Sequence, residues 1–388
     1  MKLKKFIFPA IFFILILFPF ILWFIWKISA STQMNIFIMD KTVASSECSE
    51  HNAFNGVLTH QKYVKNNNTL YSSVENYFGF FPKEKSAFLI KDLEKYSNRQ
   101  IDSLADFYSM AYYTDTYGLT KNDWFGKKEP SAFSMKLYGG LDENDVRFLE
   151  KMKEKNKLII AEFNFLAKPT ADAVRANAES LLDINWTGWT GKYFECLDTT
   201  KNEKLPDWIT GLYVKQNHGN WPFKQSGIVF VNNFTLKVVV LENIIDLDFE
   251  APQIVTATNG QDTYEVPYKM PFSGWFDITY PMDGSQEIIS YYRIKTNNHG
   301  DSVMVNNKLP RVFPAIIKNK SGNIFYFCGD FCDNTESLRL LKFAGIPVLA
   351  SFLSDKNNIS DPSSFYWNFY FPMMKNILND YCQTLKKN

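Results

Sequence analysis

Cysteine and histidine are scarce in this sequence. The 388 residues include five cysteines and four histidines. A small, odd number of cysteines in so long a chain excludes a disulfide-stabilised scaffold. No histidine has a cysteine at the spacing of zinc ligands, so we expect no metal site. Cys328 and Cys332 could either form a disulfide across a turn or remain buried thiols.

An excess of charge of either sign is also absent. The chain has 42 Lys and Arg against 41 Asp and Glu, and these residues are interspersed. Nucleic-acid-binding proteins usually carry a basic patch or stripe, so we expect no nucleic-acid partner. The sequence shows no internal repeat, and it leads us to expect no cofactor.

One long apolar run is present, at the N-terminus. Residues Phe6–Trp26 carry no charge, three lysines precede them, and Lys27 follows. At about 1.5 Å per residue the run spans roughly 30 Å, the thickness of a hydrocarbon core. It predicts a transmembrane signal-anchor over residues 1–27, with a cytoplasmic N-terminus and the bulk of the chain extracytoplasmic at the cell membrane. A cleaved signal peptide is the alternative, although the run is longer than usual for one.

The stretch Leu158–Asn164 is central to the predicted fold. Its apolar residues run unbroken and then give way to Glu162 and Asn164, as in a strand buried on both faces of a parallel sheet. A strand over residues 35–39 followed by a helix has the form of a first βαβ unit. We therefore predict an α/β protein with a mostly parallel, doubly wound sheet, an antiparallel β extension and the N-terminal transmembrane helix.

The predicted organisation divides the chain by pattern. Residues 28–34 form a tether and residues 35–245 the α/β core, in which the Gly- and Trp-rich segment 185–191 is expected to be an irregular loop. Residues 246–310 alternate short β-type runs with turns, which indicates a β-rich insertion. Residues 311–388 supply return strands, paired as a hairpin, and C-terminal helices of the same domain.

Acidic residues follow four of the predicted strands. They are Asp40, Asp115, Glu162 and Asp330. Because the carboxyl ends of parallel strands share one edge of a sheet, where ligands bind, we expect these side chains to converge. An acid after a strand is often only a helix cap or turn former. Four like charges at one edge, however, lower stability unless a cation, ligand or bound proton offsets them.

Other polar and aromatic residues are expected at the same edge. Lys41 could neutralise one acid, and two tryptophans lie on predicted loops near Tyr117. Aromatic rings beside carboxylates suit a carbohydrate, whereas packing beneath loops is the alternative for the tryptophans. The candidate ligand-binding residues are Asp40, Lys41, His51, Asp115, Tyr117, Glu162, Asn164, Trp186, Trp189 and Asp330.

The layout resembles the class I glutamine amidotransferase-like superfamily, which has a flavodoxin-like architecture. The resemblance is carried by the first strand into Asp40-Lys41-Thr42, by Tyr112–Gly118, by the helix before Leu158–Asn164 and by the late strand Gly322–Phe327. It covers about residues 35–245 and 310–345 and implies a flavodoxin-like sheet.

The nucleophile of the amidotransferases is missing. Active members carry a cysteine on a sharp turn after a central strand, whereas Glu162-Phe163-Asn164 follows the corresponding strand here. The resemblance therefore implies a non-amidotransferase branch, and no catalytic residue is carried over. The chain is also similar to uncharacterised membrane-anchored bacterial proteins of this type, which implies a location in the cell envelope.

Three functions are compatible with these patterns. The first is an extracytoplasmic, membrane-anchored protein that binds a glycan or other cell-envelope ligand at the carboxyl edge of its sheet. The second is a polysaccharide hydrolase that uses two of the carboxylates as acid and base. The third is a non-catalytic structural or assembly protein of the envelope, whose aromatic loops contact a protein partner. The sequence leaves open whether the protein is an enzyme.

Overall fold

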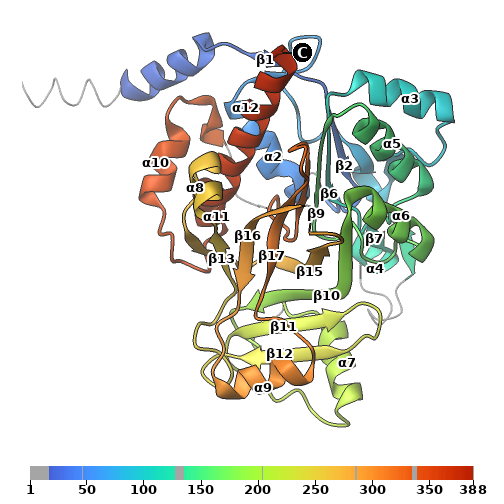
Figure 1. The fold of residues 1–388 in the computed structure, drawn as a ribbon, viewed down its shortest axis with the longest axis vertical. Helices are drawn as coiled ribbons and strands as arrows, with labels where there is room; N and C mark the ends of the chain where they lie inside the picture. The colour runs from blue at the N-terminus through green and yellow to red at the C-terminus, as the bar shows by residue number, and fades with distance from the viewer. Residues whose placement is uncertain are drawn as a thin grey trace, which may run out of the picture.

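The computed structural model describes residues 17–387 except residues 46, 127–134, 203, 285 and 334–338. The protein is an α/β protein with one ten-stranded sheet, one four-stranded sheet and two short two-stranded ladders. Figure 1 shows helices on both faces of the large sheet and the four-stranded sheet below it.

Five neighbouring strands at the centre of the large sheet run parallel. Their order is β4-β2-β6-β9-β18. This is the 2-1-3-4-5 order of flavodoxin-like proteins, as the sequence led us to expect for this part of the sheet. The apolar residues of these strands are buried because helices cover both faces. The strands are β2 (Ile36–Asp40), β4 (Phe78–Pro82), β6 (Met110–Asp115), β9 (Leu158–Glu162) and β18 (Ile324–Phe327).

Antiparallel strands extend this centre at both ends, so the prediction of a mostly parallel sheet is wrong. Of the neighbouring pairs in the large sheet, four are parallel and five antiparallel. The predicted hairpin of return strands is present and attaches the antiparallel part to β18. The added strands are β17 (Val312–Lys318), β16 (Glu287–Arg293), β13 (Gln253–Thr256) and β14 (Lys269–Pro271) at one end and β5 (Phe88–Lys91) at the other.

Helices form a layer on each face of the large sheet (Figure 1). On one face α2 (Ser49–His60) contacts β6 and packs against α12 (Phe371–Lys387), which contacts α8 (Thr258–Tyr264). On the other face α5 (Glu143–Glu154) packs between α3 (Asn98–Phe107) and α6 (Asp172–Leu182). Helix α5 illustrates the local cause, since its buried Val146, Leu149 and Met152 recur at helical spacing and form one apolar stripe.

The four-stranded sheet corrects the prediction for residues 185–191. They belong to β10 (Ile184–Phe194), a long strand with a β-bulge between Trp186 and Thr190. Alternation of buried and partly exposed side chains along β10 is the period of a strand, which the glycines obscured in the sequence. All pairs in this sheet are antiparallel, in the order β12 (Val238–Glu242), β11 (Gly227–Asn232), β10 and β15 (Trp275–Pro281). Helix α7 (Asp207–Gln216) covers it.

Shorter elements connect these layers. They are β1 (Thr32–Gln33), β3 (Tyr63–Val64), β7 (Leu119–Thr120), β8 (Lys136–Tyr138), α4 (Lys121–Phe125), α9 (Asn298–Asn306), α10 (Ile346–Leu353), α11 (Pro362–Phe365), the 3-10 turns η1 (Glu84–Ser86) and η3 (Arg339–Lys342), and the π-helical turn η4 (Tyr366–Tyr370).

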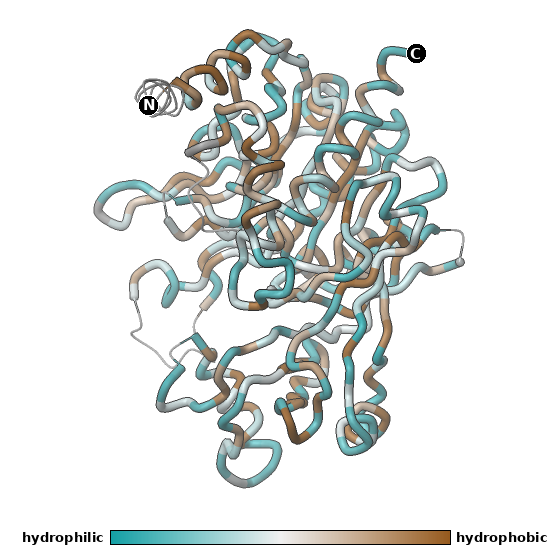
Figure 2. The backbone as a smooth tube through the Cα atoms, turned by 90° about the vertical axis from the view of Figure 1, so that its left-hand side faces the viewer, coloured by the Kyte–Doolittle hydropathy of each residue, from teal (hydrophilic) through white to brown (hydrophobic). Residues whose placement is uncertain are grey.

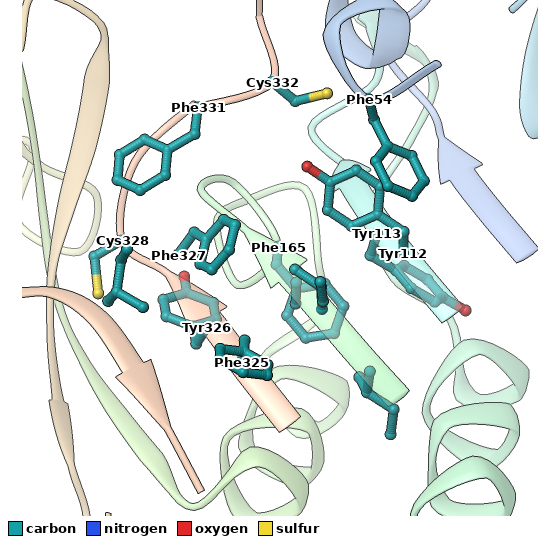
Figure 3. Packing of buried hydrophobic residues seen from close by; sticks show 14 of the residues in the cluster. Phe54, Tyr112, Tyr113, Phe165, Phe325, Tyr326, Phe327, Cys328, Phe331 and Cys332 are labelled. Atoms are coloured by element: carbon teal, nitrogen blue, oxygen red, sulfur yellow. The ribbon is translucent and has the colours of Figure 1, made fainter. Parts of the chain in front are cut away.

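The core is rich in aromatic side chains, and Figure 3 shows part of it. The rings of Phe54 on α2 and Tyr112 on β6 lie 4.3 Å apart, which fixes this helix on the sheet. Figure 2 shows that the backbone segments in the interior are largely hydrophobic, whereas many loops are hydrophilic. Cys328 and Cys332 are both buried free thiols, which resolves the alternatives left by the sequence.

The N-terminal helix corrects the membrane prediction. Within the part of the chain that the structure describes, no helix is sufficiently long and apolar to span a bilayer. Residues 17–28 are helical. The Trp26 indole donates to the His60 carbonyl at 3.1 Å. The predicted signal-anchor and the single-pass cell-membrane location derived from it are therefore contradicted; residues 6–16 of the predicted span lie outside the described residues.

Candidate functional site

The carboxyl ends of the central parallel strands define the candidate site. β2 and β6 are neighbours, and Asp40 is paired in register with Asp115. The chain leaves β2 and β6 toward opposite sides of the sheet, so the strand order reverses between them. Such a switch point is where doubly wound proteins bind ligands. Both acids are buried at this point.

Asp40 forms a buried ion pair with His51 on α2. The Asp40 carboxylate lies 2.5 Å from His51 Nδ1, and Nε2 lies 2.6 Å from the carbonyl oxygen of Ser73. Because both ring nitrogens face acceptors, both must carry hydrogen, so the ring is an imidazolium. Burial opposes this charge, but the hydrogen bond to Asp40, the charge of Asp40 and the interaction with Cys48 together outweigh burial and raise the pKa of His51 to about 10.

Asp115 lies beside this pair in a small hydrogen-bonded group. Its carboxylate accepts from the Tyr117 backbone N–H at 2.6 Å and from the Asn164 amide at 3.3 Å. Burial nevertheless raises the pKa of Asp115 to about 7, and the charge of Asp40 acts in the same direction. The Tyr117 side chain is 44 % exposed and borders this edge. The structure thus brings together Asp115, Tyr117 and Asn164.

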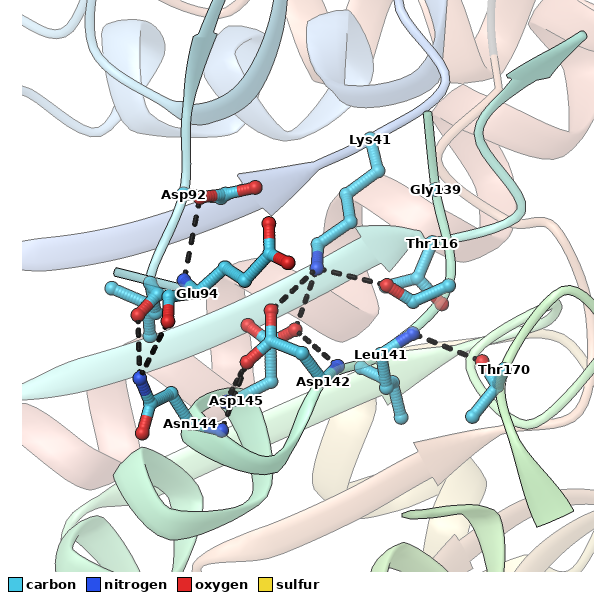
Figure 4. Close-up of polar contacts among 12 residues, drawn as sticks. Lys41, Asp92, Glu94, Thr116, Gly139, Leu141, Asp142, Asn144, Asp145 and Thr170 are labelled. Carbon is cyan, nitrogen blue, oxygen red and sulfur yellow. Dashed lines mark hydrogen bonds and ion pairs between the residues drawn. The ribbon is translucent and has the colours of Figure 1, made fainter. Parts of the chain in front are cut away.

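Lys41 makes its ionic contacts away from this group. Figure 4 shows its ammonium group among Asp142, Asp145 and the loop that precedes α5. Lys41 Nζ is 2.6 Å from the Asp145 carboxylate and 2.9 Å from the Gly140 carbonyl. Burial opposes the charged form, but Asp145 and Asp142 together with Asp92 outweigh burial and raise the pKa of Lys41. Lys41 therefore ties β2 to α5.

Glu162 is a buried structural acid at the end of β9. It accepts hydrogen bonds from the Tyr112 hydroxyl and from the backbone N–H groups of Phe331 and Cys332, the latter at 3.1 and 3.0 Å. Burial raises the pKa of Glu162 to about 8 despite these donors. Figure 3 shows Cys332 and Tyr112 on facing segments. Glu162 thereby holds the segment after β18 in place.

Two acids that the sequence reasoning missed complete the group at this edge. Carboxylate oxygens of Glu50, Asp330 and Asp333 lie within 4.8 Å of one another. Burial and mutual repulsion raise the pKa of Glu50 and of Asp330 well above their usual ranges. Glu50 directly precedes His51 in the first turn of α2, so the placement of His51 could have pointed to it. Oxygens at this spacing could bind a divalent cation such as Ca²⁺.

A cavity of about 700 Å³ opens beside these acids. Asp330 and Asp333 lie on one wall. Burial raises the pKa of Asp333, and the charge of Lys192 on β10 partly opposes that rise. The cavity extends between the two sheets toward α11. Its other lining residues include Tyr193, Phe194, Phe272, Phe365 and Tyr366.

The two predicted tryptophans lie elsewhere. Trp186 is buried in the core, and its indole N–H points to the Trp189 carbonyl at 3.4 Å. Trp189 is partly buried and packs against the same core. Neither residue lines the cavity. The packing alternative therefore describes both tryptophans, and the aromatic residues of the cavity come from segments distant in sequence.

A larger cavity, of about 1,020 Å³, lies between α10 and α12. Its charged residues include Glu265 and Lys375, which form an ion pair at 2.6 Å. Because these two charges are paired with each other, neither requires a ligand to offset it. We therefore place the candidate site at the carboxyl edge of the parallel strands, where several like charges meet.

The fold and this edge define an α/β protein with a flavodoxin-like parallel centre and an acidic cluster at its switch point. No protein-family model matches the sequence, and no curated protein matches it. A solved structure from Bacteroides uniformis, described as a thua-like protein, is similar with a TM-score of 0.33 and 11 % identity. The match covers 86 % of this chain and 97 % of that chain. It is a distant structural neighbour and leaves the activity of this chain open.

Proposed function

We propose that this protein binds a polyhydroxylated ligand, a glycan fragment, in the cavity beside Asp330 and Asp333. The observation that carries the proposal is that charged and aromatic side chains line the same cavity. The carboxylates of Asp330 and Asp333 and the ammonium group of Lys192 line it together with phenylalanine and tyrosine side chains. Sugars present hydroxyl groups around a ring whose faces are partly apolar, so they match such a lining.

Each part of the cavity would have a separate role. The carboxylates of Asp330 and Asp333 would accept hydrogen bonds from sugar hydroxyls, and such charge-assisted bonds are stronger than neutral ones. The ammonium of Lys192 would donate to a further hydroxyl or carboxylate of the ligand. The partly exposed ring of Phe365 would contact the apolar face of a sugar ring.

The spacing of the acids favours binding over hydrolysis. A glycosidase needs two carboxyl groups about 5–9.5 Å apart, on either side of the bond that is cleaved. One carboxylate oxygen each from Glu50, Asp330 and Asp333 lies within 4.8 Å of the others, closer than the carboxyl groups of a glycosidase. This arrangement instead resembles one side of a binding site, which a cation or a proton shared among the acids would stabilise.

Isothermal titration of the full chain with chitotetraose, cellotetraose and maltotetraose tests the proposal. We expect one of these sugars to bind the wild-type chain. Asp330→Asn should weaken its binding at least about tenfold, the loss of roughly one charge-assisted hydrogen bond. Glu143→Gln is the matched control, because Glu143 is an exposed acid on α5 and should leave binding unchanged. Binding that Asp330→Asn leaves intact, or no binding of any sugar, would contradict the proposal.

A further inference from the structure

A third cavity, of about 630 Å³, lies beside helix α7. One face of the helix lines it, formed by Asp207, Thr210, Gly211 and Val214, which follow one another at the spacing i, i+3, i+4 and i+7. Another face carries Ile209, which is buried in the core between α7 and the four-stranded sheet (Figure 1). The packing of α7 therefore leaves its more polar face directed to the cavity.

Gly211 is an unexpected residue in the middle of this helix. Glycine lowers the stability of a helix interior relative to alanine, so its presence there usually has a packing or functional reason. A Cβ atom at Gly211 would have no atom of another segment within 4 Å, so packing does not require the glycine. Its missing side chain instead keeps the wall of the cavity low, and a ligand could lie directly against the helix.

Trp221 supplies an aromatic surface in the same cavity. Its indole N–H donates to the Leu197 carbonyl at 2.7 Å. Its ring also makes edge-to-face contacts with Tyr213 and Phe223, with ring centres 5.2 and 5.0 Å apart. These contacts fix the indole before a ligand arrives, and a preorganised side chain loses little entropy on binding.

The lining of this cavity favours an uncharged polar ligand. Of the described residues around it, Asp207 alone carries a formal charge, and it lies in the first turn of α7, where the helix dipole favours a negative charge. Thr199, Asn202 and Thr210 add hydroxyl and amide groups. A sugar ring has hydroxyl groups at its rim and a partly apolar face, so it matches polar groups beside an indole.

Asn202 connects this cavity with the one beside Asp330, because it lines both. Its side-chain amide donates to the Cys196 carbonyl at 2.5 Å and accepts from the Lys204 backbone N–H at 2.9 Å. The side chain is thereby held in place. Its amide nitrogen has a second hydrogen and its oxygen a second lone pair, so both can still bind a ligand.

We propose that the cavity beside α7 extends the glycan site, so that one oligosaccharide contacts Asp330 at one end and Gly211 and Trp221 at the other. This inference rests on the proposed function, because it places the same ligand in both cavities. It adds that the ligand is a linear, uncharged oligosaccharide and that its affinity rises with its length. A disaccharide held at Asp330 would leave the cavity beside α7 empty.

Isothermal titration of the full chain with pairs of short and long sugars tests the extension. The pairs are chitobiose and chitotetraose, cellobiose and cellotetraose, and maltose and maltotetraose. In one pair we expect the tetrasaccharide to bind at least about tenfold more tightly than the disaccharide, the gain from roughly one additional aromatic contact and its hydrogen bonds.

Gly211→Leu should abolish that gain and leave the affinity for the disaccharide unchanged, because the leucine side chain would fill the cavity beside α7. Leucine stabilises a helix relative to glycine, so a loss of binding in this variant cannot arise from unfolding. Lys215→Leu is the matched control. Lys215 is an exposed residue of the same helix outside the cavity, and its substitution should leave the gain intact.

Trp221→Ala provides a second test, with circular dichroism to verify the fold. It should weaken tetrasaccharide binding about tenfold. If Gly211→Leu or a folded Trp221→Ala binds the tetrasaccharide as tightly as the wild-type chain does, while Asp330→Asn binds it weakly, the extension is overturned and the proposed function stands. Equal wild-type affinities for disaccharide and tetrasaccharide would also overturn the extension alone. Absence of binding for every sugar would contradict both proposals.

Discussion

Glu162 and Asp330 follow neighbouring parallel strands, but their surroundings differ. Glu162 ends β9 and is enclosed by the Tyr112 hydroxyl and two backbone N–H groups. Asp330 follows β18, faces the carboxylates of Glu50 and Asp333, and borders a cavity. Burial raises the pKa of both acids. Glu162 therefore accepts hydrogen bonds from its own chain, whereas Asp330 faces other carboxylates and a cavity.

This difference separates structural acids from candidate binding acids. A buried carboxylate with several internal donors is stabilised in place and has few lone pairs left for a ligand. A carboxylate that faces other carboxylates destabilises the empty fold, and a ligand, cation or proton relieves that cost. Position at a strand end is the same for both residues. The number of donors around the carboxylate decides the role.

The largest expected effect is on folding, from Glu162→Ala. The substitution leaves the Phe331 and Cys332 N–H groups without their acceptor in the core, and it also removes the Glu162 side chain that fills this space and accepts from the Tyr112 hydroxyl. At about 1–3 kcal/mol for each unsatisfied group, with some relaxation, the free energy of unfolding should fall by about 4 kcal/mol. Urea unfolding followed by circular dichroism measures it.

Glu162→Gln is the control for that loss. Its amide oxygen can still accept from the two N–H groups, and the Tyr112 hydroxyl can donate to Tyr370 instead, 2.7 Å away. We expect this variant to lose only about 1 kcal/mol. An alanine variant as stable as the glutamine variant would show that Glu162 is not the structural acid described here.

His51→Ala should have the next largest effect. It leaves the buried Asp40 carboxylate without its cation, a change that typically costs about 3 kcal/mol or more. His218→Ala, at an exposed position, is the matched control and should change the free energy of unfolding by less than about 0.5 kcal/mol. Equal melting temperatures for the two variants would contradict the buried ion pair.

The pH dependence of stability should show the raised pKa of Glu162. Its folded-state pKa of about 8 lies above the usual value of 4.5, so the folded state binds more protons between these pH values. The free energy of unfolding should therefore fall as the pH rises from about 4.5 to about 8. Chemical denaturation at both ends of this range should show a smaller fall for Glu162→Gln than for the wild-type chain. An equal fall would place the titration on other groups.

The smallest effect on folding is expected from Asp330→Asn. It removes one of three neighbouring negative charges and no acceptor of a backbone N–H. The free energy of unfolding should change by less than about 1 kcal/mol, toward greater stability near neutral pH. A differential scanning measurement beside Glu162→Gln makes the comparison direct. A large loss of stability in Asp330→Asn would remove the distinction between the two acids.

Part of the fold could be predicted because its signals are local. The unbroken apolar run of Leu158–Ala161 indicated a strand covered on both faces, and β9 is such a strand. For residues 185–191 the prediction was wrong. Their glycines and tryptophans indicated a loop, but these residues belong to strand β10, which contains a β-bulge. Strand pairing supplied by β11 and β15 overrode the local preference.

The N-terminal apolar run is a second segment for which the local pattern led to a wrong prediction. Length and lack of charge predicted a membrane span, but no helix among the described residues is long and apolar enough for one, and Trp26 is hydrogen-bonded to His60 of α2. The large sheet was predicted as mostly parallel because the alternating β and α patterns dominate the first half of the chain. Four of the five added antiparallel strands come from the second half of the chain.

The sequence by itself determined which side chains stand at the ends of the parallel strands, because period and apolar runs fix where a strand stops. It also determined that Asp40, Asp115, Glu162 and Asp330 would share one edge, given parallel pairing. Only the tertiary structure decided what each acid meets there. Glu162 accepts three hydrogen bonds, whereas the carboxylate of Asp330 lies beside that of Glu50. Lys41 likewise forms its ion pair with Asp145. These contacts join segments far apart in the chain, and the free energy of a buried charge depends on such neighbours.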